Sequence, residues 1–115
     1  GVDQSGLIQV VSGDWCEQRK YSDGRLVTFI WFNVSARDGT NNATHCSYKI
    51  IHYPIPYKKV NMNISSVVNT NDIGFYGHIS ADMSNNSNTD TACRVFVMEA
   101  LTDLWFQGIV IGTWK

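Results

Sequence analysis

Residues 25–34 read RLVTFIWFNV and give the clearest indication of the fold. β-Branched and aromatic residues dominate this stretch, and such residues favour strands. Its apolar residues occupy odd and even positions alike, whereas successive side chains of a strand point to opposite faces. A strand that is apolar on both sides needs cover on both faces. The protein's own core supplies one cover, and we expect a neighbouring subunit to supply the other.

The rest of the chain consists of similar short segments. Val, Ile and Thr contribute 29 of the 115 residues, whereas Leu, Ala and Glu contribute 11, which favours sheet over helix. Turn signals such as Asp23-Gly24 and Pro54-Ile55-Pro56 separate the segments. The expected strands are residues 7–11, 15–21, 25–34, 45–51, 58–67, 73–80, 92–101 and 105–114. About eight short strands predict one all-β domain over residues 1–115, an antiparallel β-sandwich.

The pattern also predicts which side chains share a face. Val60, Met62 and Ile64 alternate with polar residues and are expected on one side of their strand. Four aromatic residues within strands are expected in the core: Phe29, Trp31, Phe96 and Phe106. The cysteines are odd in number and far apart: Cys16, Cys46 and Cys93. Three buried thiols are the favoured interpretation, and one bridge plus a free thiol is the alternative.

The charge balance excludes several classes of protein. Nine Lys and Arg against ten Asp and Glu give a net charge of −1, which argues against a nucleic-acid binder and against a polybasic membrane-surface protein. The sequence contains no stretch of 18 apolar residues, so it predicts no transmembrane helix. Asn, Ser and Thr number 28, so the expected surface is polar but mostly uncharged. Such a surface suits neutral partners such as sugars.

Motifs of catalysis are absent from the sequence. It has no Gly-x-Ser-x-Gly elbow, phosphate-binding loop or His-Glu-x-x-His helix. The carboxylates of Asp72, Asp82, Asp90 and Asp103 fall in expected turns, where spacing gives no sign of convergence. A depolymerase, the enzymatic alternative, needs two carboxyl groups across a cleft. We therefore expect no enzyme, no cofactor and no metal site.

Three segments, in order, resemble the C-terminal domains of bacteriophage tail-fibre proteins. Residues 16–27, CEQRKYSDGRLV, resemble the family's Gln-Lys-Leu-Pro-(Ser/Asn)-Gly-Leu-Ile opening, with Asp23-Gly24 in place of the Pro-containing turn. Residues 48–60, YKIIHYPIPYKKV, are similar to its Phe-Pro-Ile-Ala-Phe-Pro stretch. Residues 105–114, WFQGIVIGTW, are similar to its terminal Trp-Ile-Ala-Ile-Gly-Tyr strand.

The resemblance implies a homotrimeric β-sandwich at the tip of a fibre, with this chain as the C-terminal piece of a longer fibre chain. It also implies a virion protein, made in the cytoplasm of the bacterial host, that adsorbs the particle to a surface glycan or an outer-membrane protein. Three copies of a weak site add avidity. Two alternatives stay open: a trimerisation domain that caps the fibre without host contact, and a lectin-like bacterial adhesin.

Two polar loops and two tyrosines beside the proline break are the expected receptor contacts. Amide and carboxylate side chains bind sugar hydroxyl groups, and an exposed aromatic ring stacks on the apolar face of a sugar. The favoured loop contributes Asp82, Asn85, Asn86, Asn88 and Asp90, the second loop contributes Arg37, Asp38, Asn41 and Asn42, and the aromatic pair is Tyr53 and Tyr57.

Overall fold

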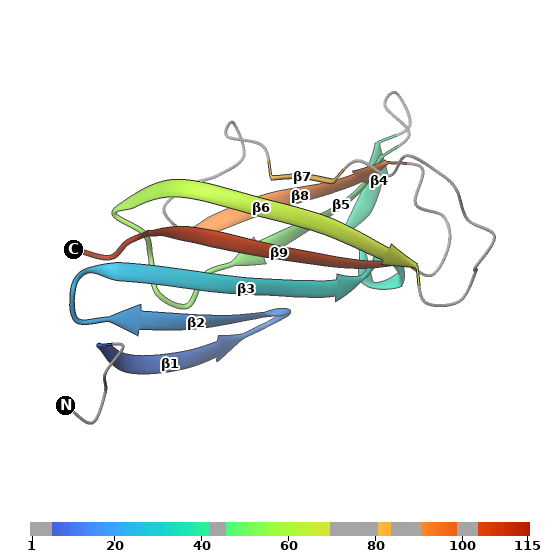
Figure 1. The fold of residues 1–115 in the computed structure, drawn as a ribbon. Coiled ribbons are helices and arrows are strands. Elements are labelled where there is room, and N and C mark those ends of the chain that lie inside the picture. The colour runs from blue at the N-terminus through green and yellow to red at the C-terminus, as the bar shows by residue number, and fades with distance from the viewer. Residues whose placement is uncertain (1–5, 42–45, 70–80, 84–90, 99–103) are drawn as a thin grey trace.

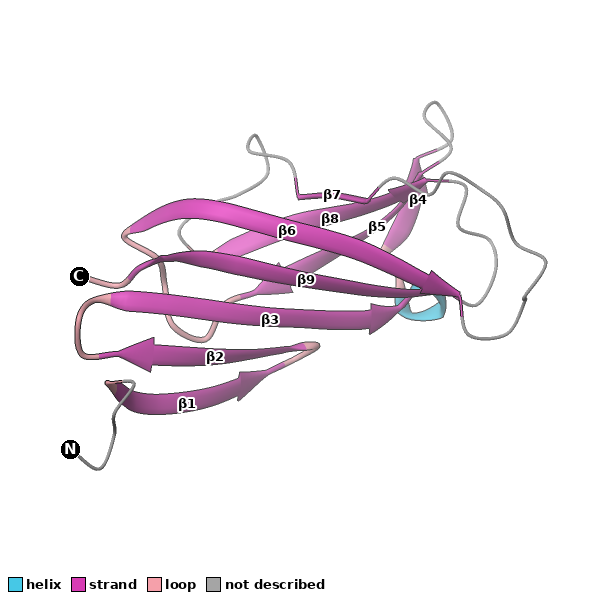
Figure 2. Cartoon of the chain, viewed as in Figure 1, coloured by secondary structure: helices cyan, strands magenta, loops and turns pink. Residues whose placement is uncertain are grey.

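A computed structural model describes residues 6–41, 46–69, 81–83, 91–98 and 104–115. Within this part every regular element except a 3₁₀ turn is a strand (Figure 2). The expected all-β class is confirmed. The elements are β1 (Leu7–Gly13), β2 (Cys16–Tyr21), β3 (Arg25–Asn33), the 3₁₀ turn η1 (Val34–Ala36), β4 (Gly39–Asn41), β5 (Cys46–His52), β6 (Lys59–Asn69), β7 (Ala81–Met83), β8 (Ala92–Met98) and β9 (Leu104–Thr113).

The strands form two antiparallel sheets. Sheet A has five strands in the order β1-β2-β3-β9-β6, and sheet B has four in the order β4-β5-β8-β7. In Figure 1, β5 and β8 of sheet B lie behind β6 and β9 of sheet A. The chain crosses from sheet A to sheet B through η1, directly after β3. Sheet A is thus built from two consecutive hairpins, β1-β2-β3, to which β9 and β6 are added, and sheet B forms the second layer of the expected sandwich.

The core lies between the sheets, and strict alternation along β3 and β9 supplies much of it. Leu26, Ile30 and Phe32 point inward from β3, and Phe106 and Val110 do so from β9. The rings of Phe32 and Phe106 pack with centroids 5.4 Å apart. Sheet B contributes a smaller set of buried apolar side chains: Ile51, Cys93 and Val95. Cys16 and Cys93 are both free, buried thiols, in agreement with the favoured interpretation for those two.

The alternation expected along β6 is broken by a β-bulge. The pairing with β9 shifts between Val60, opposite Gly112, and Met62, opposite Ile111. Val60 therefore packs against the core, whereas Met62 is exposed on the other side of the sheet. The prediction that both point the same way is wrong, because Asn61 is an extra residue that the ladder does not pair. β6 comes very close to β9 here, since a Cβ on Gly112 would lie 2.1 Å from the Lys59 carbonyl oxygen.

The polar loop expected at residues 36–44 contains structure of its own. Asn33 caps η1 through its side-chain oxygen, which accepts a hydrogen bond of 2.8 Å from the Ser35 N–H. The short strand β4 then pairs with β5. The expected strand at residues 73–80 lies outside the described residues. In the described part, no helix is long and apolar enough to span a membrane.

A chain of buried hydrogen bonds ties the proline break to sheet A. The Gln18 amide accepts from the Ile55 N–H at 2.6 Å and donates to the Ile55 carbonyl at 2.9 Å. The same amide donates to the Thr28 hydroxyl at 3.1 Å. Thr28 and Tyr57 hydroxyls are bonded, and Tyr57 donates to the Val110 carbonyl at 3.0 Å, so Thr28 must be the donor to Tyr57. Gln18 thus replaces the ladder partners that Ile55 lacks between two prolines.

Candidate functional site

The solvent-facing side of sheet A, which we call the outer face, is apolar across β3, β9 and β6. Its exposed large apolar side chains are Trp31, Met62 and Ile64, with exposures from 39% at Trp31 to 51% at Ile64. Register places Phe29 opposite Ile109, and Ile64 on the far side of Ile109. The prediction that Phe29 and Trp31 lie in the core of one subunit is wrong, because they alternate with Ile30 and Phe32, which do.

A groove of about 380 Å³ runs along this outer face. Among the described side chains that line it, Gln107 is the one polar group; the lining residues are Phe29, Ile30, Trp31, Ile64, Gln107, Gly108 and Ile109. Arg19 borders the groove, with its guanidinium 4.9 Å from the centroid of the Phe29 ring and its Nε 3.1 Å from Glu17. The combination of an apolar floor and a charged border is typical of a protein contact surface.

Part of the second expected contact loop gathers at one end of the sandwich. Arg37 and Asp38 follow η1, and Asn41 ends β4. The Asp38 carboxylate accepts from the Ile50 N–H at 2.7 Å and from Lys49 Nζ at 3.1 Å. Partial burial raises the pKa of Asp38, but these bonds outweigh that effect and hold the pKa below its usual value. Both oxygens of the Asp38 carboxylate are therefore bonded to β5.

The favoured contact loop is only partly described. Asp82 lies in β7, opposite Phe96 of β8. β7 and β4 are the two edges of sheet B, so their backbones lie about 14 Å apart, which is three strand spacings. Asp82 is therefore not adjacent to the second loop. The remaining expected contacts in these loops, Asn42, Asn85, Asn86, Asn88 and Asp90, lie outside the described residues.

The tyrosines expected to stack on a sugar are in the core instead. Tyr53 is 6% exposed and Tyr57 is 2% exposed. Their rings meet edge to face with centroids 5.0 Å apart. This prediction is wrong because Tyr57 is needed inside, where it links Thr28 to Val110. The buried Gln18 side chain, which binds this segment to sheet A, was not singled out from the sequence. The one signal for it was alternation along the strand, which places Gln18 on the face opposite to Arg19.

Burial also shapes the chemistry of the core groups beside these tyrosines. Loss of solvation raises the pKa of Cys93 to about 11, and it raises the pKa of Tyr57 as well. The Tyr53 hydroxyl is buried and has no hydrogen-bond partner among the residues that the structure describes. A buried, protonated thiol is a poor nucleophile. Within the described ranges, no group of three His, Cys, Asp or Glu residues has the arrangement of a metal site.

The fold of this chain is shared by solved structures of tail fibres. No protein-family model and no curated protein matches the sequence. The chain is similar to the N-truncated R1-type pyocin tail fibre, with a TM-score of 0.57 and 14% identity over 90% of this chain and 84% of that chain. It is also similar to the P. aeruginosa R1 pyocin fibre of C-terminal residues 323–701, with a TM-score of 0.56, 15% identity and 91% coverage of this chain.

In the second comparison this chain covers 28% of the solved chain of fibre residues 323–701. Identities of this size concern the fold alone. At that level the resemblance read from residues 16–27, 48–60 and 105–114 is confirmed. In the structure these three segments are β2 with its turn into β3, the end of β5 with the proline break, and β9.

Proposed function

We propose that the chain is the receptor-binding domain of a phage tail fibre and that it adsorbs the particle to a glycan or an outer-membrane protein of a bacterial host. The observation that carries the proposal is the tail-fibre fold over nine-tenths of the chain. The protein would then be part of a virion or of a comparable particle. It would act by binding alone, without chemistry.

The outer face of sheet A supports a homotrimer. Monomeric proteins rarely expose a large contiguous apolar patch, and here Trp31, Met62 and Ile64 are exposed beside half-buried Ile109 and Ile111. Burying such side chains contributes about 25 cal/mol per Å². The central part of the face carries no charge, and interfaces between identical subunits are more apolar than other contacts. A second copy of the chain is therefore the occupant that this face fits.

A binding role without catalysis agrees with the placement of the carboxylates. Glu17 is paired with Arg19, Asp23 with Arg25, and Asp38 with Lys49. Each of these pairs stands in a different part of the fold, so no two of them face each other across a cleft as a glycosidase requires.

A trimerisation domain that caps the fibre is the second candidate. The burial of Tyr53 and Tyr57 favours it, because two of the aromatic residues expected to contact a receptor serve the core. The two candidates share the trimer and differ in whether the isolated domain binds cells.

The trimer is tested by light scattering after size exclusion, and host contact by cell binding. We expect a mass of three subunits for the wild-type chain. Ile64→Asp, which puts a charge in the centre of the outer face, should give a monomer. Ser35→Asp, which adds the same charge on exposed η1, should leave the mass unchanged. A wild-type monomer would contradict the homotrimer.

For host contact, a fluorescently labelled trimer is mixed with a panel of bacteria that begins with P. aeruginosa. Saturable binding to some strains and not to others is expected of a receptor-binding domain. A trimer that binds none of a broad panel would support the capping domain instead.

A further inference from the structure

Five of the nine Lys and Arg residues lie at one end of the sandwich, away from the outer-face groove. We call this set the cationic end: Lys20, Arg25, Lys58, Lys59 and Lys115. Thr113 brings the backbones of three of these residues together. Arg25 and Lys59 pair with Thr113 from the two neighbouring strands, and the Lys58 N–H donates to the Thr113 carbonyl at 2.7 Å. The backbones of Arg25 and Lys59 are thus two strand spacings, or about 10 Å, apart.

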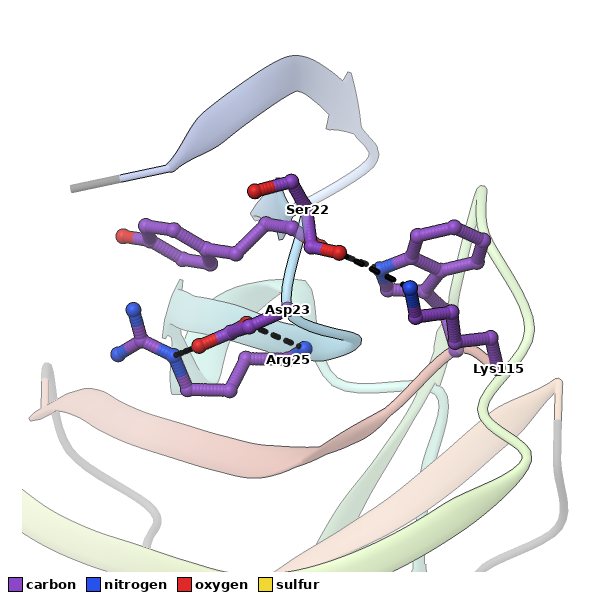
Figure 3. A network of polar contacts seen from close by, with 6 residues as sticks. Ser22, Asp23, Arg25 and Lys115 are labelled. Atoms are coloured by element: carbon purple, nitrogen blue, oxygen red, sulfur yellow. Dashed lines mark hydrogen bonds and ion pairs between the residues drawn. The ribbon is translucent and has the colours of Figure 1, made fainter. Parts of the chain in front are cut away.

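The indole ring of Trp114 holds two of the ammonium groups in place. Lys20 Nζ lies 4.0 Å from the ring centroid and Lys115 Nζ lies 5.4 Å from it. The ring itself is fixed, because its Nε1–H donates to the Tyr21 carbonyl at 2.7 Å. Lys115 is held further by its bond of 3.0 Å to the Ser22 carbonyl, which Figure 3 shows at the β2–β3 turn. Cation–π contacts and hydrogen bonds therefore preorganise these charges.

Negative charge does not balance this end within the described part of the chain. Asp23 is the one described carboxylate side chain there, and both of its oxygens bond to Arg25, at 3.0 Å each (Figure 3). These bonds from Arg25 hold the pKa of Asp23 below its usual value. By contrast, Lys49 and Arg19 elsewhere in the fold have carboxylate partners of their own. Lys20 and Lys115 have no ion pair among the described residues.

The physical consequence is a local excess of positive charge with an ordered shape. Two ammonium groups on one ring lie within about 10 Å of each other, the Debye length at 0.1 M salt, so they repel. An anion bound between them removes that repulsion and gains charge-assisted hydrogen bonds. Little side-chain entropy is lost on binding, because the aromatic ring already restricts both lysines.

We propose that the cationic end binds a phosphate monoester through Lys20 and Lys115, whose ammonium groups lie next to the same Trp114 ring. Phosphate fits because its several oxygens can accept from two ammonium groups at once. The site itself does not depend on the tail-fibre role; only the source of the phosphate, a phosphorylated sugar of the host surface, rests on the proposed function.

The site is tested by NMR titration of the ¹⁵N-labelled protein at constant ionic strength, with three separate probes: inorganic phosphate, glucose 6-phosphate and glucose. Phosphate and glucose 6-phosphate should cause saturable shifts in the amides of Gly24, Trp114 and Lys115, and glucose should cause none. A lower dissociation constant for glucose 6-phosphate than for inorganic phosphate would identify a phosphorylated sugar as the ligand source; equal constants would limit the site to the phosphate group.

Variants decide whether the effect is local. Lys20→Gln and Lys115→Gln should each weaken phosphate binding by about fivefold or more, the scale of one charge-assisted bond. Lys49→Gln removes the same charge on sheet B and should leave binding unchanged. Near-identical amide spectra of the variants away from the cationic end would show that each remains folded.

Three results would overturn the proposal: shifts that do not saturate, an equal loss in Lys49→Gln, or equal shifts with glucose. None of them bears on cell adsorption, which is measured separately. Conversely, a domain that binds phosphate but no cells would retain the site and lose only the proposed function.

Discussion

The two faces of sheet A are both apolar, yet they are completed in different ways. The inner face is closed within the chain: Phe106 and Leu26 are fully buried, and the polar groups of Gln18, Thr28 and Tyr57 bond one another. The outer face leaves Ile64 about half exposed. Hydrophobic residues alone therefore do not mark the core of a subunit. The inner face is distinguished by polar groups that find partners inside the same chain, and the outer face by their near absence.

The largest expected effect is on the inner face. Phe106→Ala removes a fully buried ring that packs on Phe32, and such truncations cost about 3–5 kcal/mol. We expect a loss of that size in the free energy of unfolding, measured by denaturant titration at any protein concentration. Ile64→Ala on the outer face is the control. Its effect should grow as the protein is concentrated through the assembly range, because its lost contacts lie between subunits. An effect of Ile64→Ala that is independent of concentration would contradict the comparison.

The next effect comes from the buried polar chain. Gln18→Met keeps the approximate volume but leaves the Ile55 N–H and carbonyl without partners. Each unsatisfied buried group costs about 1–3 kcal/mol. Ile55 is only half-buried, so about 1–2 kcal/mol for each of its two groups, or about 2–4 kcal/mol in all, is expected. The matched change Gln9→Met, at an exposed position of β1, should be close to neutral. Equal losses in both variants would show that the chain of bonds contributes nothing.

Alkaline pH should weaken the inner face selectively. Burial raises the pKa of Cys93 from 9.0 to about 11. The unfolded chain therefore releases this proton first, and the free energy of unfolding should fall as the pH rises from 9 to 11. Cys93→Ala should make this part of the profile less steep, and the raised pKa values of Cys16 and Tyr57 account for the slope that remains. Ellman's reagent should label Cys93 slowly in the folded protein and rapidly after denaturation. A stability profile that stays level from pH 9 to pH 11 would contradict the raised pKa.

The smallest effect separates two neighbouring tyrosines. Tyr57→Phe removes the hydroxyl that joins Thr28 to the Val110 carbonyl and should cost about 1–2 kcal/mol. Tyr53→Phe removes a buried hydroxyl without a well-formed hydrogen bond and should be neutral or slightly stabilising. Thermal unfolding of both variants measures the difference. The reverse order would show that the Tyr53 hydroxyl is the better bonded of the two.

The strands could be predicted from sequence to within a few residues, because the period of two and the turn residues are local signals. β2, β5 and β9 begin and end within about two residues of their expected bounds. β4 was missed because a three-residue edge strand in an Asn- and Gly-rich segment takes its structure from pairing with β5. Such pairing is a tertiary contact, and composition does not reveal it.

The candidate site was harder to predict than the fold. Alternation showed that residues 25–34 need two covers, but it did not show which aromatic residues take which face, so Phe29 and Trp31 were assigned to the core. Tyr53 and Tyr57 were expected to contact a receptor because they flank the proline break and would stack on a sugar if exposed, with partial burial as the alternative. Here the segment packs inside the fold, because the Gln18 side chain bonds to Ile55, which is 37 residues away along the chain. The cationic end likewise joins residues 20 and 115, which the sequence separates.

The bulge in β6 has a consequence for the evolution of the chain length. Because Asn61 is the unpaired residue, Val60 and Met62 already face opposite sides as consecutive residues of a regular strand would. A homologue that lacks this one residue would keep both faces of β6 intact and would differ only in local twist. Sequence alignments of such fibre domains should therefore permit a one-residue gap at Asn61. If the gap is not allowed, every β6 residue on one side of Asn61 is aligned with a residue that faces the opposite side of the sheet.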